Sequence, residues 1–477
     1  MARGAGPPQD TTSPQPARGP PNADPRSGAP PGLYPVGMIT PRRRPTLAWA
    51  LWDAGSASFN AVMTTFVFSV YLTSASFGDE AHTSRVLSTG LAIAGLVVAL
   101  SAPVVGQRAD RAGSRRRALG LNTALVAVCV AACFFVRPEP AYLYLGVGLL
   151  GLANIFNEIA TVHYNALLPV ISTPKTVGRV SGIGWSFGYF GGILALLIVL
   201  LGFISPGLLG LPEEEEALNL RGVAVFSAVW LAALSLPILV RFPETAVEDL
   251  APQAARESIR DSYRRLGRTL LRLLREEPAT LRFLIASAVF RDGLAGIFTF
   301  GGVLAAGTFG FSTNQVIVFA IAGNLVAGAG ALLGGRLDDL LGPKRVIVIS
   351  LVCLIAAASP LLLLRGQAAF WVCGLILCGF VGPAQSAART YLSRITTPGK
   401  EGEYFGLYST TGRAMSFLAP ALFSLFVAIT GQQIWGVAGI ILVLAAGLIL
   451  ALTLPRVGGA QQPGAEADAD GLRVREG

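Results

Sequence analysis

Charged residues are scarce in this chain, and that scarcity excludes an ordinary soluble domain. Only 14% of the 477 residues are Asp, Glu, Lys or Arg, whereas soluble chains carry about 25%. Hydrophobic residues make up 52%, and the mean hydropathy is +0.58. Such a composition cannot cover a large surface with groups that favour water, so it indicates a protein that faces lipid.

Residues that bind metals, nucleotides or reaction intermediates are also few. There are two histidines, and the five cysteines lie inside apolar runs without metal-ligand spacing. No glycine-rich phosphate loop ends in Gly-Lys-Ser/Thr, and no Ser/His/Asp grouping or zinc helix is evident. We therefore predict no metal, no cofactor, no enzymatic activity and no ATP-driven step, with reduced cysteines that serve packing.

Long apolar runs dominate the rest of the chain. Runs of 18 or more residues can cross a hydrocarbon core about 30 Å thick, and helices satisfy their own backbone in lipid. We expect an all-α polytopic membrane protein with twelve transmembrane helices. The expected spans are residues 48–73, 86–106, 118–136, 141–168, 179–204, 221–241, 281–308, 314–335, 346–364, 369–392, 403–429 and 433–454.

The spans divide into two groups of six. Residues 46–241 are expected to form an N-terminal six-helix bundle and residues 281–454 a C-terminal one. The basic stretch 242–280 carries arginines threaded with leucines and is expected to be a cytoplasmic linker, partly an amphipathic helix at the membrane surface. Residues 1–45 and 455–477 lack large apolar side chains and are expected to be disordered cytoplasmic tails.

The net charge of +9 follows the membrane topology. Basic residues gather in alternate gaps, as the positive-inside rule describes, so no nucleic-acid partner is expected. We expect both termini in the cytoplasm, a bacterial plasma (inner) membrane and a monomer in the lipid bilayer. The basic gaps hold residues 42–44, 108–117, 175–179, 256–275, 344–345 and 394–400.

A short polar motif occurs twice, about half the chain apart. Each copy has glycine, aspartate, glycine and two basic residues at the same offsets. The two copies are Gly106, Asp110, Gly113, Arg115 and Arg116, with Arg111 beside them, and Gly335, Asp339, Gly342, Lys344 and Arg345. A second duplication relates Pro174, Gly178 and Gly182 to Pro398, Gly402 and Gly406. Repeats of this kind fit two bundles related by an axis along the membrane normal.

The repeated aspartates predict a cytoplasmic hinge or gate. Asp110 and Asp339 lie just past the apolar runs, where a carboxylate can accept charge-assisted hydrogen bonds from arginine or from a neighbouring helix N-terminus. Such bonds can hold the two halves together and break when the cytoplasmic side opens. The alternative is that these are basic loops, set by topology, with incidental acidic residues.

Ionisable residues within the spans are the candidates for a substrate or proton-coupling site. A charge at the bilayer centre costs about 3 kcal/mol or more, so such groups are expected to face a cavity or one another. A polar stripe on the fourth span accompanies them. The candidates are Asp53, Asn154, Asn157, Glu158, Tyr164, Asn165, Arg291, Asp292, Arg389 and Arg413. The alternative for each is a structural ion pair between helices.

Several long stretches resemble a known family. They are WALWDAGSASF at 49–59, HYNALLP with GRVSGIGWSFGYFGG within 163–192, FRDGLAGIFTFGG at 290–302, and GGRLDDLLGPKR at 334–345, followed by SAARTYLSR and EGEYFGLYSTTGR within 386–413. The chain resembles the autophagy-related vacuolar amino-acid effluxers of the major facilitator superfamily and their bacterial relatives, over about residues 46–454. The resemblance implies a twelve-helix fold and alternating access. It departs from the family after Asp53, where Ala54 to Ala57 replace the usual Trp-Ala-Asn-Ser.

We therefore expect a secondary active transporter that exports a small organic solute, with amino acids as one class and protons as one coupling ion. A large aromatic cavity would favour multidrug efflux instead. The other alternative is a membrane sensor or scaffold on the same fold that transports nothing and binds a partner through the basic stretch.

Overall fold

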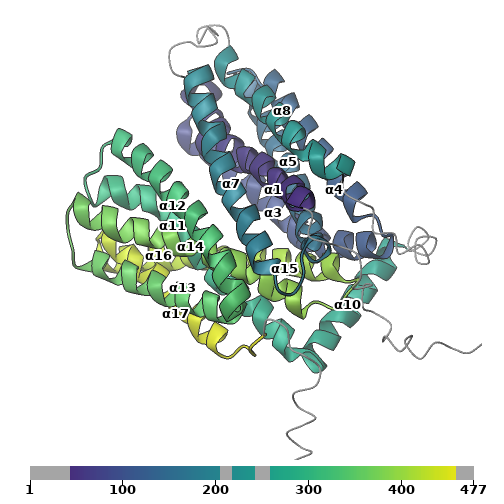
Figure 1. Cartoon of the computed structure of the whole chain (residues 1–477). Coiled ribbons are helices and arrows are strands. Elements are labelled where there is room, and N and C mark those ends of the chain that lie inside the picture. Colours follow the sequence, from purple (N-terminus) through teal and green to yellow (C-terminus); the bar gives the residue numbers. More distant parts are fainter. Residues whose placement is uncertain (1–42, 205–216, 242–257, 458–477) are drawn as a thin grey trace, which may run out of the picture. The chain divides into compact units, whose positions relative to one another are not determined.

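The described part of the computed structural model is built from helices and comprises residues 43–204, 217–241 and 258–457; it contains no strand (Figure 1). The expected disordered tails lie almost wholly outside the described residues. The same is true of residues 242–257 in the expected linker.

The first half contributes six spans. They are formed by α1 (Arg43–Ser58) with the π-helical segment η1 (Phe59–Phe66) and α2 (Phe68–Leu72), then α3 (Glu80–Arg111), α4 (Arg115–Ala132), α5 (Leu143–Ala166) with the short α6 (Leu168–Ile171), α7 (Val177–Val199) and α8 (Leu218–Arg241). Within this half, α1 packs on α7 and α8, and α5 packs on α3 and α4.

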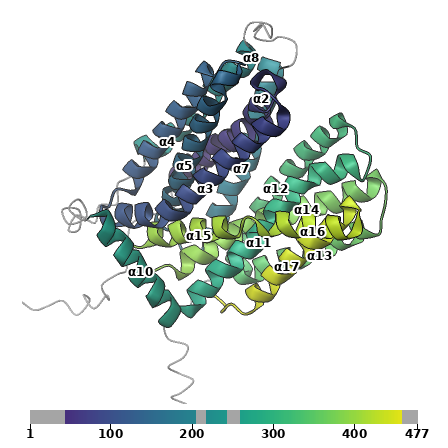
Figure 2. The same ribbon diagram turned by 180° about the vertical axis from the view of Figure 1, so that it is seen from behind.

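The second half repeats the pattern after a helix at the surface. Its helices are α10 (Ile259–Arg275), α11 (Pro278–Gly307), α12 (Thr313–Leu341), α13 (Pro343–Ala358), α14 (Gln367–Ile395), α15 (Glu401–Met415) with α16 (Leu418–Thr430), and α17 (Gly436–Leu452). Here α14 packs on α12 and α13, and α17 packs on α11, α13 and α16 (Figure 2).

The twelve-helix prediction is confirmed. Eleven helical stretches among the described residues are long and apolar enough to span a membrane. The first span is the twelfth; it is formed by α1, η1 and α2 and contains several polar residues, among them Asp53 and Asn60. A π-helical segment inside a membrane span is commonly found at a functional site.

The helices extend beyond the apolar runs from which they were predicted. Helix α3 starts at Glu80 rather than 86 because the Asp79 carboxylate accepts a hydrogen bond from the His82 amide (3.2 Å). Helices α3 and α12 also continue to Arg111 and Leu341. Asp110 and Asp339 therefore lie past the apolar runs, as expected, but still within the last turns of these helices.

Helix α10 occupies part of the predicted basic linker. Ser258 caps it by accepting from the Asp261 amide (3.2 Å), and Thr269 and Leu273 are buried. Leu271 and Leu274 are exposed on the same helix, and its placement at a membrane surface stays a prediction.

The eleventh span is broken inside the membrane. Helix α15 ends at Met415 and α16 begins at Leu418, so the first amides of α16 lack helical partners. The buried Asp292 of α11 fills this role, because its Oδ2 atom accepts a hydrogen bond from the Ala419 amide (2.5 Å). Asp292 thus provides a cap for a helix in another span.

Replacing Asp292 tests this capping role. We expect Asp292→Ala to destabilise the protein by about 1–2 kcal/mol, since a buried helix N-terminus loses its acceptor. Asp292→Asn keeps a good capping oxygen and should retain most of the stability. Thermal unfolding in detergent measures both variants, and equal midpoints for them would contradict the capping role.

Candidate functional site

A cavity of about 540 Å³ lies between the two halves. Its walls come from α1, η1 and α7 of the first half and from α11, α12, α14 and α17 of the second. Among the described residues that line it, Asp53 is the single charged one. The aromatic lining residues are Phe66, Trp185, Tyr189, Phe298, Phe319 and Phe370, and the polar ones include Asn60, Thr65, Thr299 and Asn324.

The cavity extends from Asp53 away from the repeated motifs. Phe370 and Val437 line it from the first turns of α14 and α17. Both helices begin at the end of the protein opposite Asp110 and Asp339, which lie in the last turns of α3 and α12. We call the end that carries these two aspartates the hinge end.

Asp53 joins the cavity to a polar cluster between the halves. Its Oδ2 atom accepts a hydrogen bond from the Tyr164 hydroxyl (3.1 Å) and lies 3.7 Å from Nη1 of Arg389. The side chain of Asp53 is 23% exposed, whereas that of Arg389 is 5% exposed. The carboxylate can therefore meet a solute, while the guanidinium stays behind it.

Arg389 of α14 is held by groups of the first half. Its Nε and Nη2 atoms donate to the hydroxyl and carbonyl oxygens of Ser181 (2.9 and 2.6 Å), and Nη1 donates to Oδ1 of Asn165 (3.2 Å). The guanidinium also lies over the rings of Trp49 and Trp185, 4.8 and 5.6 Å from their centroids. A cation from one half is thus enclosed by partners from the other.

A glycine makes this enclosure possible. A Cβ atom on Gly184 would lie 2.5 Å from the Trp49 ring and 2.9 Å from Nη2 of Arg389. Real Cβ atoms essentially never come within 3.0 Å of such neighbours. The glycine-rich sequence of α7 therefore lets the arginine and the indole reach the helix backbone.

The first hinge contact joins α3 to α15. The Asp110 carboxylate accepts hydrogen bonds from the amides of Gly402 and Glu403 (2.9 Å each) and from Nε of Arg115 (2.6 Å). Arg115 also pairs with Glu401. Asp110 therefore neutralises the positive N-terminus of a helix in the opposite half.

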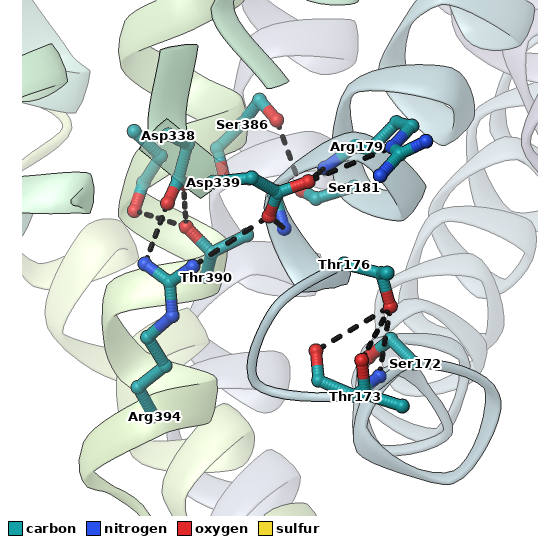
Figure 3. A network of polar contacts seen from close by, with 12 residues as sticks. Ser172, Thr173, Thr176, Arg179, Ser181, Asp338, Asp339, Ser386, Thr390 and Arg394 are labelled. Carbon is teal, nitrogen blue, oxygen red and sulfur yellow. Dashed lines mark hydrogen bonds and ion pairs between the residues drawn. The ribbon is translucent and has the colours of Figure 1, made fainter. Parts of the chain in front are cut away.

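The second hinge contact joins α12 to α7 in the same way (Figure 3). The Asp339 carboxylate accepts from the amides of Gly178 and Arg179 (2.8 and 3.0 Å). Next to it, Asp338 is fully buried and pairs with Arg394 of α14 (2.5 Å) and with the Thr390 hydroxyl. Figure 3 shows that Arg394 lies between the two aspartates, and its Nη2 atom is 3.7 Å from Oδ1 of Asp339.

Glycines bring these helices into backbone contact. A Cβ atom on Gly402 would lie 2.6 Å from the Gly106 carbonyl oxygen, and one on Gly178 would lie 2.6 Å from that of Gly335. The two duplicated sequence patterns therefore bind each other crosswise, the motif of one half against the glycine-rich helix start of the other.

The remaining motif residues shape the turns after the two aspartates. Gly113 and Gly342 have φ values of +59° and +84°, a conformation that disfavours other residues. Lys344 donates to the Leu452 carbonyl (2.8 Å) at the end of α17, so it differs from its counterpart Arg115. Arg345 is exposed. Arg111 and Arg116 are half-buried.

The other ionisable candidates lie away from the lining of the cavity. Glu158 of α5 pairs with Arg413 of α15 and accepts from the Ser409 hydroxyl (3.3 Å). Arg291 lies 3.9 Å from the centroid of the Tyr408 ring and donates to the carbonyl of that residue.

The two asparagines of the polar stripe also lie outside that lining. Asn157 is buried and accepts from the Ser56 hydroxyl (3.0 Å), and Asn154 is half-buried. The stripe on α5 therefore faces neighbouring helices.

Sequence reasoning missed several residues of these contacts. Four residues that were not predicted bind a predicted site residue or lie beside one. They are Ser181, Asp338, Arg394 and Glu401. Asp338 and Arg394 lie just past the expected spans 314–335 and 369–392, and nothing local indicated their pairing.

Solved structures with the same fold define the class of protein. The proton:xylose symporter XylE matches with a TM-score of 0.68 at 13% identity, covering 89% of this chain and 98% of that one. The human organic anion transporter MFSD10 matches with a TM-score of 0.66 at 15% identity, covering 87% and 100%. The chain is an integral membrane protein with the major facilitator superfamily fold.

The family follows from sequence comparison. The family model described as "Vacuole effluxer Atg22 like" matches residues 69–463, so the chain belongs to that family. The MFS-type transporter YxiO of Bacillus subtilis (strain 168) is 22% identical over 414 residues, 86% of this chain and 94% of YxiO.

A fungal relative matches over a shorter stretch. Autophagy-related protein 22 of Cryptococcus neoformans var. neoformans serotype D (strain B-3501A) is 23% identical over 295 residues, 58% of this chain. The chain covers 52% of that protein, about half of its length. Both relatives agree with the resemblance predicted from the motifs.

The capping bonds of Asp339 can be tested by hydrogen exchange. Asp339→Asn removes the charge and one acceptor, and a charge-assisted hydrogen bond contributes about 1.5–3 kcal/mol. We expect the amides of Gly178 and Arg179 to exchange about tenfold faster or more. Arg345→Gln removes a charge from the same motif and should leave their exchange unchanged; acceleration in both variants would contradict a specific cap.

The pair formed by Glu158 and Arg413 predicts a compensation between two substitutions. Glu158→Gln should lower the unfolding midpoint because it leaves the Arg413 guanidinium without its partner. Adding Arg413→Gln should restore much of the loss. Thermal unfolding of both single variants and the double variant measures the coupling, and strictly additive losses would show that the two side chains do not stabilise each other.

Proposed function

We propose that this protein is a secondary transporter that exports a small organic solute by alternating access. The cavity between the halves carries the proposal, because Asp53 is the one carboxylate among its described lining residues. The distribution of arginine favours a cytoplasmic hinge end and cytoplasmic termini, in a bacterial plasma membrane. In this orientation the cavity extends toward the outside, and the hinge contacts lie on the cytoplasmic side.

The hinge contacts provide a reversible lock for the cycle. Opening the cytoplasmic side separates α3 from α15 and α12 from α7, so Asp110 and Asp339 leave the amides that they cap. Water can hydrate the freed carboxylates and amides, which lowers the cost of breaking bonds that are strong when buried. The two halves can then move as rigid units about contacts that are made in one conformation only.

Asp53 is the proposed link between solute and hinge. A basic amine bound to its carboxylate competes with Arg389, which approaches the same Oδ2 atom from α14. Weakening the Asp53–Arg389 ion pair weakens a connection between the two halves next to the cavity. A proton on Asp53 would have the same effect, so Asp53 is also the proposed coupling site.

Amino acids are the first substrate class to test. Asp53 can bind the ammonium group, and the aromatic wall of Trp185, Tyr189 and Phe298 can contact an apolar side chain. The effluxer description of the family supports an efflux function. Small apolar amino acids fit a cavity of about 540 Å³.

A second candidate is export of larger organic cations. The described lining residues include six aromatic side chains and one carboxylate, an arrangement that also suits flat, positively charged compounds. A sensor or scaffold that transports nothing is the third possibility, and it predicts binding without flux.

A thermal-unfolding screen followed by flux measurements tests these proposals. Amino acids, sugars, nucleosides and cationic drugs are added to the purified protein, since a ligand of the folded state raises the melting temperature. The class that shifts the midpoint is then assayed for flux in proteoliposomes, with and without a pH gradient. Bound ligand without flux would favour the sensor.

Asp53→Asn provides the decisive variant. We expect it to weaken binding of the amine-bearing ligand by about tenfold or more, the loss of one charge-assisted contact. Asp79→Asn, at the exposed start of α3, is the matched control and should bind normally. Normal binding and flux in Asp53→Asn would refute the proposed site.

A further inference from the structure

A second cavity, of about 560 Å³, lies at the hinge end. We call it the hinge cavity. It is enclosed by the last turn of α3, one face of α10 and the turn before α15, elements that lie together in both ribbon views (Figures 1 and 2). Its charged lining residues are Arg111, Arg265, Arg268, Arg272, Lys400, Asp110 and Glu403.

The two carboxylates of the hinge cavity already have donors. Asp110 accepts from the Gly402 and Glu403 amides and from Arg115. Glu403 accepts from Nε2 of Gln107 (2.8 Å). Among the described lining residues, five are cationic and two are carboxylates that already accept hydrogen bonds, so these residues favour an anion.

Two of the cations have unused capacity. Within the described ranges, neither Arg268 of α10 nor Lys400 before α15 makes an ion pair or a side-chain hydrogen bond. Arg272 lies one turn beyond Arg268. Its Nε and Nη2 atoms are buried and make no hydrogen bond to any residue that the structure describes. Nε of Arg272 is 3.5 Å from Glu277. A buried N–H group without an acceptor destabilises the protein, and a bound ligand can supply the acceptor.

We propose that the hinge cavity is a binding site for a phosphate-bearing anion that stabilises the conformation with the hinge contacts closed. Guanidinium groups bind phosphate oxygens through paired hydrogen bonds, and a lysine adds a point charge. The volume is sufficient for a phosphoryl group with a small organic body. This site is separate from the solute cavity, and no step of solute transport is needed for binding.

The position of the site explains the preference for one conformation. Its walls come from α3 of the first half, α15 of the second and α10 of the connecting segment. Opening at the hinge moves the start of α15 away from α3, so Lys400 would leave the other cations. A ligand that needs all of them binds the closed arrangement better and shifts the population toward it.

Two sources can supply this chemistry. Leu271 and Leu274 are exposed on α10, which suits a helix at a membrane surface. A phospholipid headgroup can therefore enter the hinge cavity from the bilayer. A soluble phosphate compound can enter from the aqueous side. The same cations would recognise both.

The experiment uses the full chain in phosphatidylcholine nanodiscs. Inorganic phosphate is titrated at constant ionic strength against chloride, and in a second arm phosphatidylglycerol replaces part of the phosphatidylcholine. Unfolding midpoints and hydrogen exchange of residues 398–403 are recorded. We expect a higher midpoint and slower exchange with at least one probe. A response to phosphate identifies a soluble ligand, and a response to phosphatidylglycerol alone identifies a headgroup.

Two double variants make the result specific. Arg268→Ala with Lys400→Ala should weaken the response about tenfold or more. Arg264→Ala with Arg275→Ala removes the same charge from α10 outside the cavity and should respond like the natural chain. Arg268→Lys with Lys400→Arg preserves the charge, and it replaces the alanine variant in this comparison if the alanine variant does not fold. Silence toward both probes, or equal losses in the Arg268/Lys400 and Arg264/Arg275 alanine variants, would overturn the proposal.

Discussion

The structure depends on two carboxylates that each cap a helix belonging to the other half. Asp110 binds the first amides of α15, and Asp339 binds those of α7. Each bond joins a negative side chain to the positive end of a helix at a site with little access to water, so it is strong while the halves touch. It is also easily replaced by water once they separate. A contact with both properties suits a molecule whose halves must hold together in one state and part in another.

Backbone proximity is the condition for these caps. Gly106 meets Gly402, and Gly178 meets Gly335, with no room for a methyl group between the helices. The same principle operates at Gly184, which admits Trp49 and Arg389 to the surface of α7. Small residues thus determine where the halves touch, and polar groups then use the short distance. The Asp53–Arg389 pair lies between the hinge contacts and the cavity that Asp53 lines.

The charged residues within the spans differ in whether they reach the cavity. Asp292 caps a broken helix, Glu158 pairs with Arg413, and Arg291 rests on Tyr408. Each of these groups has a partner that accounts for its presence within a span. Asp53 differs because its carboxylate keeps a partly open side toward the cavity. Access to a cavity, rather than charge, is what separates it from the rest.

The sequence alone determined the twelve spans, the duplication and the motif residues, because hydrophobic length and repeated spacing are properties of the chain read in one dimension. It also signalled the helix-capping role of the repeated aspartates, which remained one of two interpretations. The tertiary structure decided which elements meet. The tertiary contacts show that the motif of each half binds the opposite half, that Asp338 pairs with Arg394, and that three separate stretches of the first half surround Arg389. These contacts join residues up to some 300 positions apart. No local pattern encodes such pairings, because they arise only when the packed helices bring distant backbones together.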